Sequence, residues 1–179
     1  MWASLREESL NRKLIGVVAE VIEEQQMGRC RAEGLGRFPM SLYNADDQRD
    51  QGFPDGAADL KARIDEADAL IMSLPEYNHS IPGAFKNAID WISRYRPTNP
   101  LAGKPVLLMS AAGSLVGGHR GLQQSRVPLE ALGAVVYPRV FGLSQAHEAF
   151  DEQGRLKEPM LVRDVQALVQ SFLHFGARL

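Results

Sequence analysis

The chain has 179 residues, a length typical of one domain, and 45% of them are hydrophobic, enough for an ordinary buried core. Its formal net charge of -2 gives no electrostatic basis for binding nucleic acid or an anionic membrane surface. No apolar stretch approaches the roughly 20 residues that a membrane span needs, and the amino terminus has no apolar signal core. The single cysteine, Cys30, cannot form an internal disulfide. We therefore expect one cytoplasmic domain in which Cys30 is a small buried hydrophobe rather than a redox group.

Helical and strand-like segments alternate along the chain, which predicts an α/β fold with a parallel sheet and helices on both faces. The first half contains a helix over residues 9–26, a weak strand candidate at 30–35, a loop at 37–53, a helix marked by Leu60 and Ile64, and a strand at 69–74. The second half contains a helix capped by Ser80 with Pro82 in its first turn, a turn at 97–100, a strand at 106–110, a small-residue loop at 111–118, a helix through Leu132, a strand at 134–141 and a last helix marked by Leu161 and Phe175.

Hydroxyl groups, an arginine and an amide gather at the start of the first helix, in the run Ala3-Ser4-Leu5-Arg6-Glu7-Glu8-Ser9-Leu10-Asn11. The unpaired N–H groups and the dipole of a helix start favour an anion such as phosphate, and Arg6 adds a bidentate donor. On these residues alone, a role of Ser9 as nothing more than a helix cap is an equally good interpretation.

The strand at 69–74 leads into the polar turn Pro75-Glu76-Tyr77-Asn78-His79-Ser80. In an open parallel sheet, ligands bind outside the carboxyl ends of the strands, so this turn is expected at a ligand site. An aromatic ring, an amide and free backbone groups close together suit a flat, hydrogen-bonding ligand such as a flavin.

The turn is followed by Pro82-Gly83 and by the run Lys86-Asn87-Ala88-Ile89-Asp90-Trp91, and the strand at 106–110 by a loop of small residues, Ala111 to Gly118. With the loop at 3–11, these runs resemble the NADPH-dependent FMN reductase family, a branch of the flavodoxin-like folds. The resemblance covers nearly the whole chain from Ala3 onward and implies a flavodoxin-like, doubly wound parallel sheet.

The resemblance also implies an FMN-dependent NAD(P)H oxidoreductase of the ping-pong type. FMN would be bound without a covalent link, NADPH or NADH would supply the electrons, and a small molecule such as a quinone, azo dye, chromate or free flavin would accept them. No catalytic side chain and no metal are expected, and the chain is expected to form a homodimer or homotetramer. The implied FMN-binding residues are Ser4, Arg6, Ser9 and Asn11 for the phosphate, Pro75, Glu76, Tyr77 and Asn78 for the ribityl chain and ring, and Ser110, Gly113 and Ser114 near the ring.

Two features depart from the family pattern. Ala3 stands where the family has glycine, and only Met1 and Trp2 precede the loop, where the family has a central apolar strand. We hypothesise that an upstream segment is missing through a late start assignment or a fragment boundary; a genomic frame without apolar codons before Met1 would contradict this. The alternative is a shortened relative that closes the gap by rearrangement or by oligomerising.

Two other functions stay open at this point. A flavin-free regulatory or assembly protein would keep the fold without binding FMN, and an FMN titration separates it from a reductase. A flavodoxin-type electron carrier would bind FMN without turning over NAD(P)H, although such carriers are typically strongly acidic and this chain is nearly balanced in charge.

Overall fold

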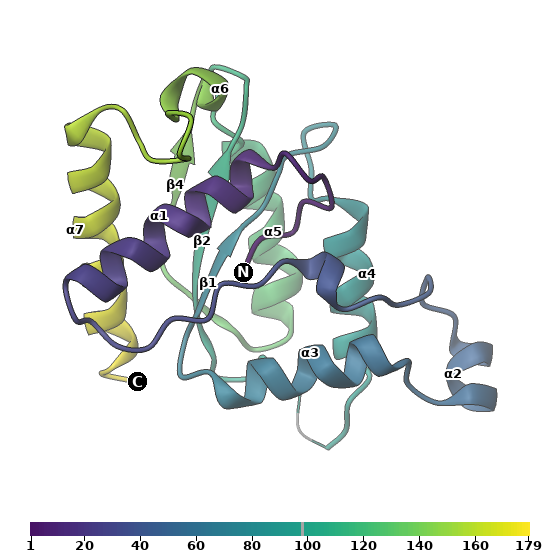
Figure 1. Ribbon diagram of the computed structural model, residues 1–179. Helices are drawn as coiled ribbons and strands as arrows, with labels where there is room; N and C mark the ends of the chain where they lie inside the picture. Colours follow the sequence, from purple (N-terminus) through teal and green to yellow (C-terminus); the bar gives the residue numbers. More distant parts are fainter. Residues whose placement is uncertain (98) are drawn as a thin grey trace.

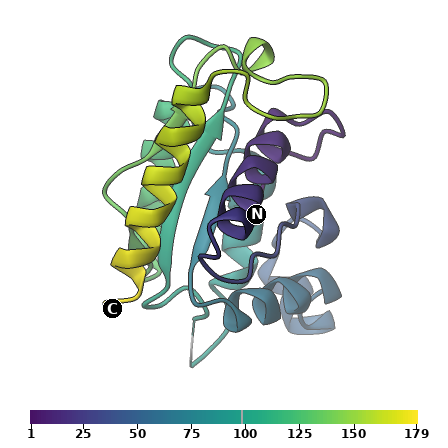
Figure 2. The ribbon, with the colours of Figure 1, turned by 60° about the vertical axis from the view of Figure 1, so that its left-hand side comes forward.

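The protein is a three-layer α/β structure in which helices cover both faces of a parallel sheet, as the computed structural model in Figures 1 and 2 shows. The structure describes residues 1–97 and 99–179, so the predicted turn at 97–100 lies partly outside the described residues. The helices are α1 (Leu10–Glu24), α2 (Ala45–Gln51), α3 (Asp55–Glu66), α4 (Gly83–Ile92), α5 (His119–Ala131), α6 (Ala146–Ala149) and α7 (Pro159–Gly176), with a short 3₁₀ helix at Leu35–Arg37. The strands are β1 (Leu70–Ser73), β2 (Pro105–Ala111), β3 (Val135–Val136) and β4 (Phe141–Leu143). None of the helices in the described part of the chain is long and apolar enough to cross a membrane.

The sheet is built around β2, and all its pairings are parallel. β1 pairs with one side of β2, while β3 and then β4 pair with the other side. All seven residues of β2 are buried. Val106 and Leu108 pack with α3, α4 and α5, whereas Leu107 and Met109 pack with α1 and α7. This alternation gives the sheet two apolar faces, which confirms the predicted doubly wound arrangement.

Trp2 occupies the position beside β1 at which the family has its central first strand. It forms single parallel bridges with Gly34 on one side and Ser73 on the other. The Ala3 N–H donates to the Ser73 carbonyl at 3.1 Å, and the Trp2 N–H donates to the Glu33 carbonyl at 3.1 Å. Trp2 therefore pairs with a neighbouring segment on each of its two sides.

The expectation of a loop over residues 37–53 is wrong, because this segment contains α2. None of its residues is buried, so no apolar periodicity announces it. Local polar contacts stabilise it instead: the Asn44 side chain caps the helix by accepting from the Asp46 N–H at 3.0 Å, and Arg49 pairs with Asp46 at 2.7 Å.

Three further expectations need correction. Pro82, not Ser80, is the residue before the first turn of α4, because Ser80 instead pairs with Tyr77 across a turn. The strand expected at 134–141 is split into β3 and β4, with Pro138, which has no N–H to donate, between them. The weak strand candidate at 30–35 reaches no more than the bridge at Gly34.

Cys30 is exposed rather than buried as expected. It lies in this 30–35 segment, which forms no strand and therefore buries little of its surface. Burial of its thiol is still sufficient to raise its pKa, with the amino terminus acting in the opposite direction.

Candidate functional site

Three loops meet at the carboxyl end of the sheet, at the upper edge in Figure 1. They are the segment before α1, the β1–α4 turn and the β2–α5 loop. Asn11, in the first turn of α1, connects them: its side-chain oxygen accepts from the Ser73 hydroxyl at 2.8 Å and from the Ala111 N–H at 3.0 Å, and its NH₂ donates to the Ala111 carbonyl at 3.1 Å. Because Asn11 is buried, these contacts hold the helix start against the ends of β1 and β2.

The segment before α1 offers an anion site at the helix start. Ser9 is the N-cap residue, and its hydroxyl accepts from the Arg12 N–H at 3.1 Å. The hydroxyl of the buried Ser4 accepts from the Arg6 N–H at 3.4 Å, while the Arg6 side chain is exposed. The positive end of a 15-residue helix and the exposed guanidinium of Arg6 lie on one short stretch of chain, an arrangement that suits phosphate.

The β1–α4 turn is tight and well defined. Asn78 and His79 have positive φ angles of 51° and 62°, and Tyr77 and Ser80 exchange both backbone hydrogen bonds, at 3.1 and 3.0 Å. Two central residues in the left-handed region make this a type I′ turn, in which asparagine is among the favoured residues. The turn leaves Tyr77 46% exposed at the end of the sheet, whereas Pro75 is buried.

Glu76 has a different role from its neighbours in the turn. Its carboxylate accepts from the Gly121 N–H at 2.9 Å and lies within 3.4 Å of His79 and 4.0 Å of Arg120. Gly121 is in the first turn of α5, and the N-cap residue Gly118 has no side chain to cap that helix. Burial acts to raise the pKa of Glu76, but the contacts with Gly121, His79 and Arg120 together lower it below its ordinary value. Glu76 therefore stays ionised and caps α5 from another loop.

The end of β2 contributes one buried hydroxyl, and the β2–α5 loop that follows contributes small residues. The Ser110 hydroxyl is fully buried and, among the described residues, has no hydrogen-bond partner. Gly118 has a φ of 79°, and a Cβ placed there would lie 2.1 Å from the Ser110 hydroxyl oxygen. Gly113 and Ser114 are exposed on the outer part of the loop. The loop thus presents backbone groups without the bulk of side chains.

Eleven residues were expected at the site, and the structure brings all of them to the same end of the sheet. Arg6, Tyr77, Asn78, Gly113 and Ser114 are exposed there. The side chains of Asn11 and Glu76 are instead engaged in holding loops and helices together. Any part that these two take in holding a ligand therefore falls mainly to their backbone groups.

Arg120 was not anticipated from the sequence. Its guanidinium lies 3.0 Å from the His79 ring nitrogen and close to Glu76, so the β1–α4 turn and α5 share a charged cluster. Its position could have indicated this role. Arg120 comes two residues after the glycine pair at 117–118 and therefore lies in the first turn of a helix that starts at the site.

The residues present suit FMN. A helix start with Arg6 provides the positive charge for a phosphate, and Tyr77 provides an exposed aromatic surface for a flat ring. Ser110, whose hydroxyl has no partner among the described residues, and the glycines of the β2–α5 loop allow close approach of polar ligand atoms. Asn11 holds these elements together before any ligand arrives.

Comparison with known proteins also indicates an FMN-dependent reductase. The family model of the NADPH-dependent FMN reductases matches residues 1–148. The chain is similar to a quinone reductase of Escherichia coli, at 40% identity over 137 residues that cover 76% of this chain and 70% of the relative. It is also similar to an NAD(P)H-dependent FMN reductase of Pseudomonas aeruginosa, at 37% identity over 77% of this chain and 74% of the relative.

Among solved structures, the chain resembles the flavoenzyme NAD(P)H:(acceptor) oxidoreductase FerB of Paracoccus denitrificans, with a TM-score of 0.85 and 31% identity over 99% of this chain and 95% of that one. A flavodoxin of Bacillus cereus shares the fold alone, with a TM-score of 0.61 and 13% identity over 97% of this chain and 94% of that one. The chain therefore belongs to the NADPH-dependent FMN reductase family, and it is an oxidoreductase that uses FMN as cofactor and NAD(P)H as electron donor.

Proposed function

We propose that this protein transfers electrons from NAD(P)H to a quinone or a similar small acceptor at the three-loop site. The observation that carries the proposal is that Asn11 ties the start of α1 to the ends of β1 and β2, at the edge of the sheet where ligands of such folds bind. The named relatives, a quinone reductase and an FMN reductase, support this class of acceptor.

The loops divide the work of holding the cofactor. The start of α1, with Ser4, Ser9 and the exposed guanidinium of Arg6, binds the phosphate. The β1–α4 turn, through Pro75, the Glu76 backbone, Tyr77 and Asn78, lies along the ribityl chain and ring. The β2–α5 loop, through Ser110, Gly113 and Ser114, approaches the ring edge. Bound there, FMN would supply the redox chemistry that links NAD(P)H to the acceptor. The protein itself supplies position and charge complementarity rather than an acid or base.

The proposal predicts that Arg6→Ala weakens FMN binding. Arg6 is exposed, so its loss leaves folding intact, while the loss of a charge-assisted contact with phosphate costs about 1.5–3 kcal/mol, or roughly 10- to 150-fold in dissociation constant. FMN fluorescence titration measures the change. Arg178→Ala removes the same charge near the carboxyl terminus, at the opposite end of the molecule in Figure 1, and should leave affinity unchanged. Equal affinities in both variants would remove Arg6 from the site.

The ping-pong order is tested by steady-state kinetics. With NADPH or NADH as donor and a soluble quinone as acceptor, double-reciprocal plots should give parallel lines as the second substrate is varied. Intersecting lines would contradict the proposed order. FMN binding without NAD(P)H oxidation would instead favour an electron carrier, and a folded protein that binds no FMN would favour a flavin-free role.

The proposal extends to a cytoplasmic homodimer or homotetramer. Three exposed apolar residues support self-association. The exposed fractions of Leu42, Leu115 and Val116 are 81%, 80% and 36%. Trp91, by contrast, is buried within the chain, and its ring N–H donates to the Ser41 carbonyl at 2.8 Å. Sedimentation velocity across a concentration series distinguishes the assemblies, and a monomer at every concentration would contradict this part.

A further inference from the structure

A fourth segment, between β4 and α6, reaches the same end of the sheet as the three loops (Figure 1). Backbone hydrogen bonds join it to the β2–α5 loop. The Ala112 N–H donates to the Leu143 carbonyl at 3.0 Å, and the Ala146 N–H donates to the Ala112 carbonyl at 3.0 Å. The Gln145 N–H donates to the Ser114 carbonyl at 3.2 Å. The β4–α6 segment is therefore fixed to the loop that is proposed to approach the ring edge of FMN.

The backbone of this segment is strained just before α6. Gln145 has a φ of 45° and a ψ of 39°, in the left-handed region that side chains other than glycine and asparagine rarely adopt. Its bond to the Ser114 carbonyl holds it in this conformation. Strain of this kind persists where the surroundings impose it, and it is concentrated at functional sites. The residue two positions further along the chain is His147.

The imidazole of His147 stands beside the β2–α5 loop at Gly113. A Cβ built on Gly113 would lie 3.6 Å from the His147 Nδ1. Within the described chain, and apart from the two chain neighbours of Gly113, no other residue comes within 4 Å of that position. The His147 side chain is 58% exposed, so a ligand that lies along this loop can meet it.

Glu148 determines which nitrogen of the ring faces the loop. Its carboxylate oxygen lies 3.4 Å from the His147 Nε2, which leaves Nδ1 on the side of Gly113. A carboxylate on one ring nitrogen orients an imidazole and leaves the other nitrogen for a ligand. The Glu148 carbonyl accepts from the Lys157 Nζ at 3.0 Å, so the helix that carries both residues is held from a further segment.

A flavin ring gains negative charge when it is reduced, so a positive charge at its edge favours the reduced form. We propose that the imidazole of His147, in its charged form, stands at the ring edge of bound FMN and raises the reduction potential of the cofactor. The β4–α6 segment is then a fourth wall of the site. The inference rests on the proposed placement of FMN at the three loops, and it does not depend on which acceptor takes the electrons.

Redox titration of the FMN-loaded protein against a reference dye, at pH 7 and without any acceptor, tests the proposal. His147→Gln removes the charge and keeps a hydrogen-bonding side chain. Reduced FMN should bind about five- to tenfold more weakly while oxidised FMN binds as before, which corresponds to a potential about 20–30 mV lower. His147→Lys keeps a positive charge and should restore most of the potential. An unchanged potential in His147→Gln, or an equal loss in both variants, would overturn the proposal.

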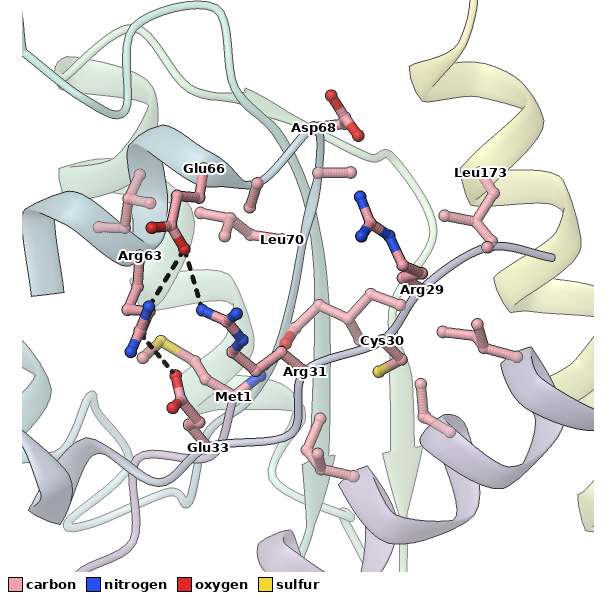
Figure 3. A pocket seen from close by; sticks show the side chains of 18 of the residues that line it. Met1, Arg29, Cys30, Arg31, Glu33, Arg63, Glu66, Asp68, Leu70 and Leu173 are labelled. Carbon is pink, nitrogen blue, oxygen red and sulfur yellow. Dashed lines mark hydrogen bonds and ion pairs between the residues drawn. The ribbon is translucent and has the colours of Figure 1, made fainter.

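Two distant variants serve as controls. Arg29→Gln removes an exposed positive charge from the wall of a cavity of about 750 Å³ at the amino end of β1 (Figure 3). That cavity is lined by residues outside the three loops and the β4–α6 segment. His174→Gln removes an exposed histidine near the carboxyl terminus, at the opposite end of the molecule in Figure 1. Both should leave the potential unchanged. A loss in either control as large as that of His147→Gln would overturn the proposal, because the effect would then not be local.

Chemical modification tests whether FMN covers His147. Diethyl pyrocarbonate acylates exposed imidazoles, and mass spectrometry of the peptides gives the rate at each histidine. Saturating FMN should slow the modification of His147 and leave that of His174 unaffected. Equal rates at His147 with and without FMN would overturn the proposal. Arg6→Ala separates this outcome from a misplaced site: weakened FMN binding in that variant with an unprotected His147 refutes the role of His147 alone, whereas unchanged FMN binding refutes the three-loop placement.

Discussion

Replacing Glu76 tests whether the β1–α4 turn holds the start of α5. Glu76→Ala removes the side-chain acceptor of the Gly121 N–H, at 2.9 Å, in a helix whose N-cap residue is a glycine. A lost cap costs about 0.5–2 kcal/mol, and the lost charge at a helix start costs about 0.3–1 kcal/mol more. The Glu76 side chain is 11% exposed, so solvent screening reduces this sum little. We expect a total loss of about 1–3 kcal/mol in the free energy of unfolding.

Urea unfolding at pH 7, followed by circular dichroism, measures this loss. Glu76→Gln keeps an acceptor but not the charge and should lose only about 0.3–1 kcal/mol. Glu152→Ala removes an exposed carboxylate that is not itself at a helix start, and should change stability by less than about 0.5 kcal/mol. The capping argument fails if Glu76→Ala and Glu152→Ala lose the same free energy of unfolding. It also fails if Glu76→Gln and Glu76→Ala lose the same amount.

The same contact has a pH signature. The folded pKa of Glu76 lies below its ordinary value of about 4.3, so the charge contributes its full stability above that pH. The contribution disappears as pH falls through the folded pKa, because the protonated group no longer favours the folded state. The stability difference between the wild type and Glu76→Gln should therefore be constant from pH 6 to 8 and shrink at pH 3. A difference that grows on acidification would show that the sign is wrong.

Three further substitutions test the loops, each by urea unfolding. Asn11→Ala leaves buried backbone groups of Ala111 without partners and should cost about 2–4 kcal/mol, whereas a loss under 1 kcal/mol would show that water replaces the amide. Gly118→Ala places a Cβ against Ser110 at a positive φ and should cost at least about 1–2 kcal/mol, with partial recovery when Ser110→Gly is added; no recovery would locate the strain elsewhere. Asn78→Ala should cost about 1 kcal/mol and Asn78→Gly nearly nothing, and the reverse order would contradict the type I′ turn.

Much of the fold could be predicted because its main elements are amphipathic or fully buried. α1 and β2 carry clear helical and strand patterns, and the structure places them within two residues of the expected bounds. α2 could not be found in this way, since a helix stabilised by Asn44 and by exposed charges leaves no apolar period in the sequence. The strand expected at 134–141 is split around Pro138, although both parts pair with β2, and hydrophobic periodicity does not report such a break.

The meeting of the loops at the carboxyl end of the sheet was predictable, but the contacts that their polar groups make were not. Parallel strands place their carboxyl ends together, so the loops after β1 and β2 had to meet. Which polar groups face a ligand and which face the protein depends on distances between segments far apart in sequence. Glu76 and Gly121 are 45 residues apart, and Asn11 and Ala111 are 100 residues apart. Cys30 was misjudged for the same reason, because its exposure depends on whether a strand stands beside it.

The choice of an amide at position 11 has a consequence for how the enzyme responds to acidity. Asn11 has no proton to gain or lose in the biological range, so its three contacts with Ser73 and Ala111 persist from acid to alkaline conditions. Glu76, by contrast, is a link that acid can break. Acidification should therefore loosen the start of α5 while the spacing between the start of α1 and the strand ends stays fixed. The contacts that hold the start of α1 are therefore independent of pH, whereas the contact that holds the start of α5 is lost in acid.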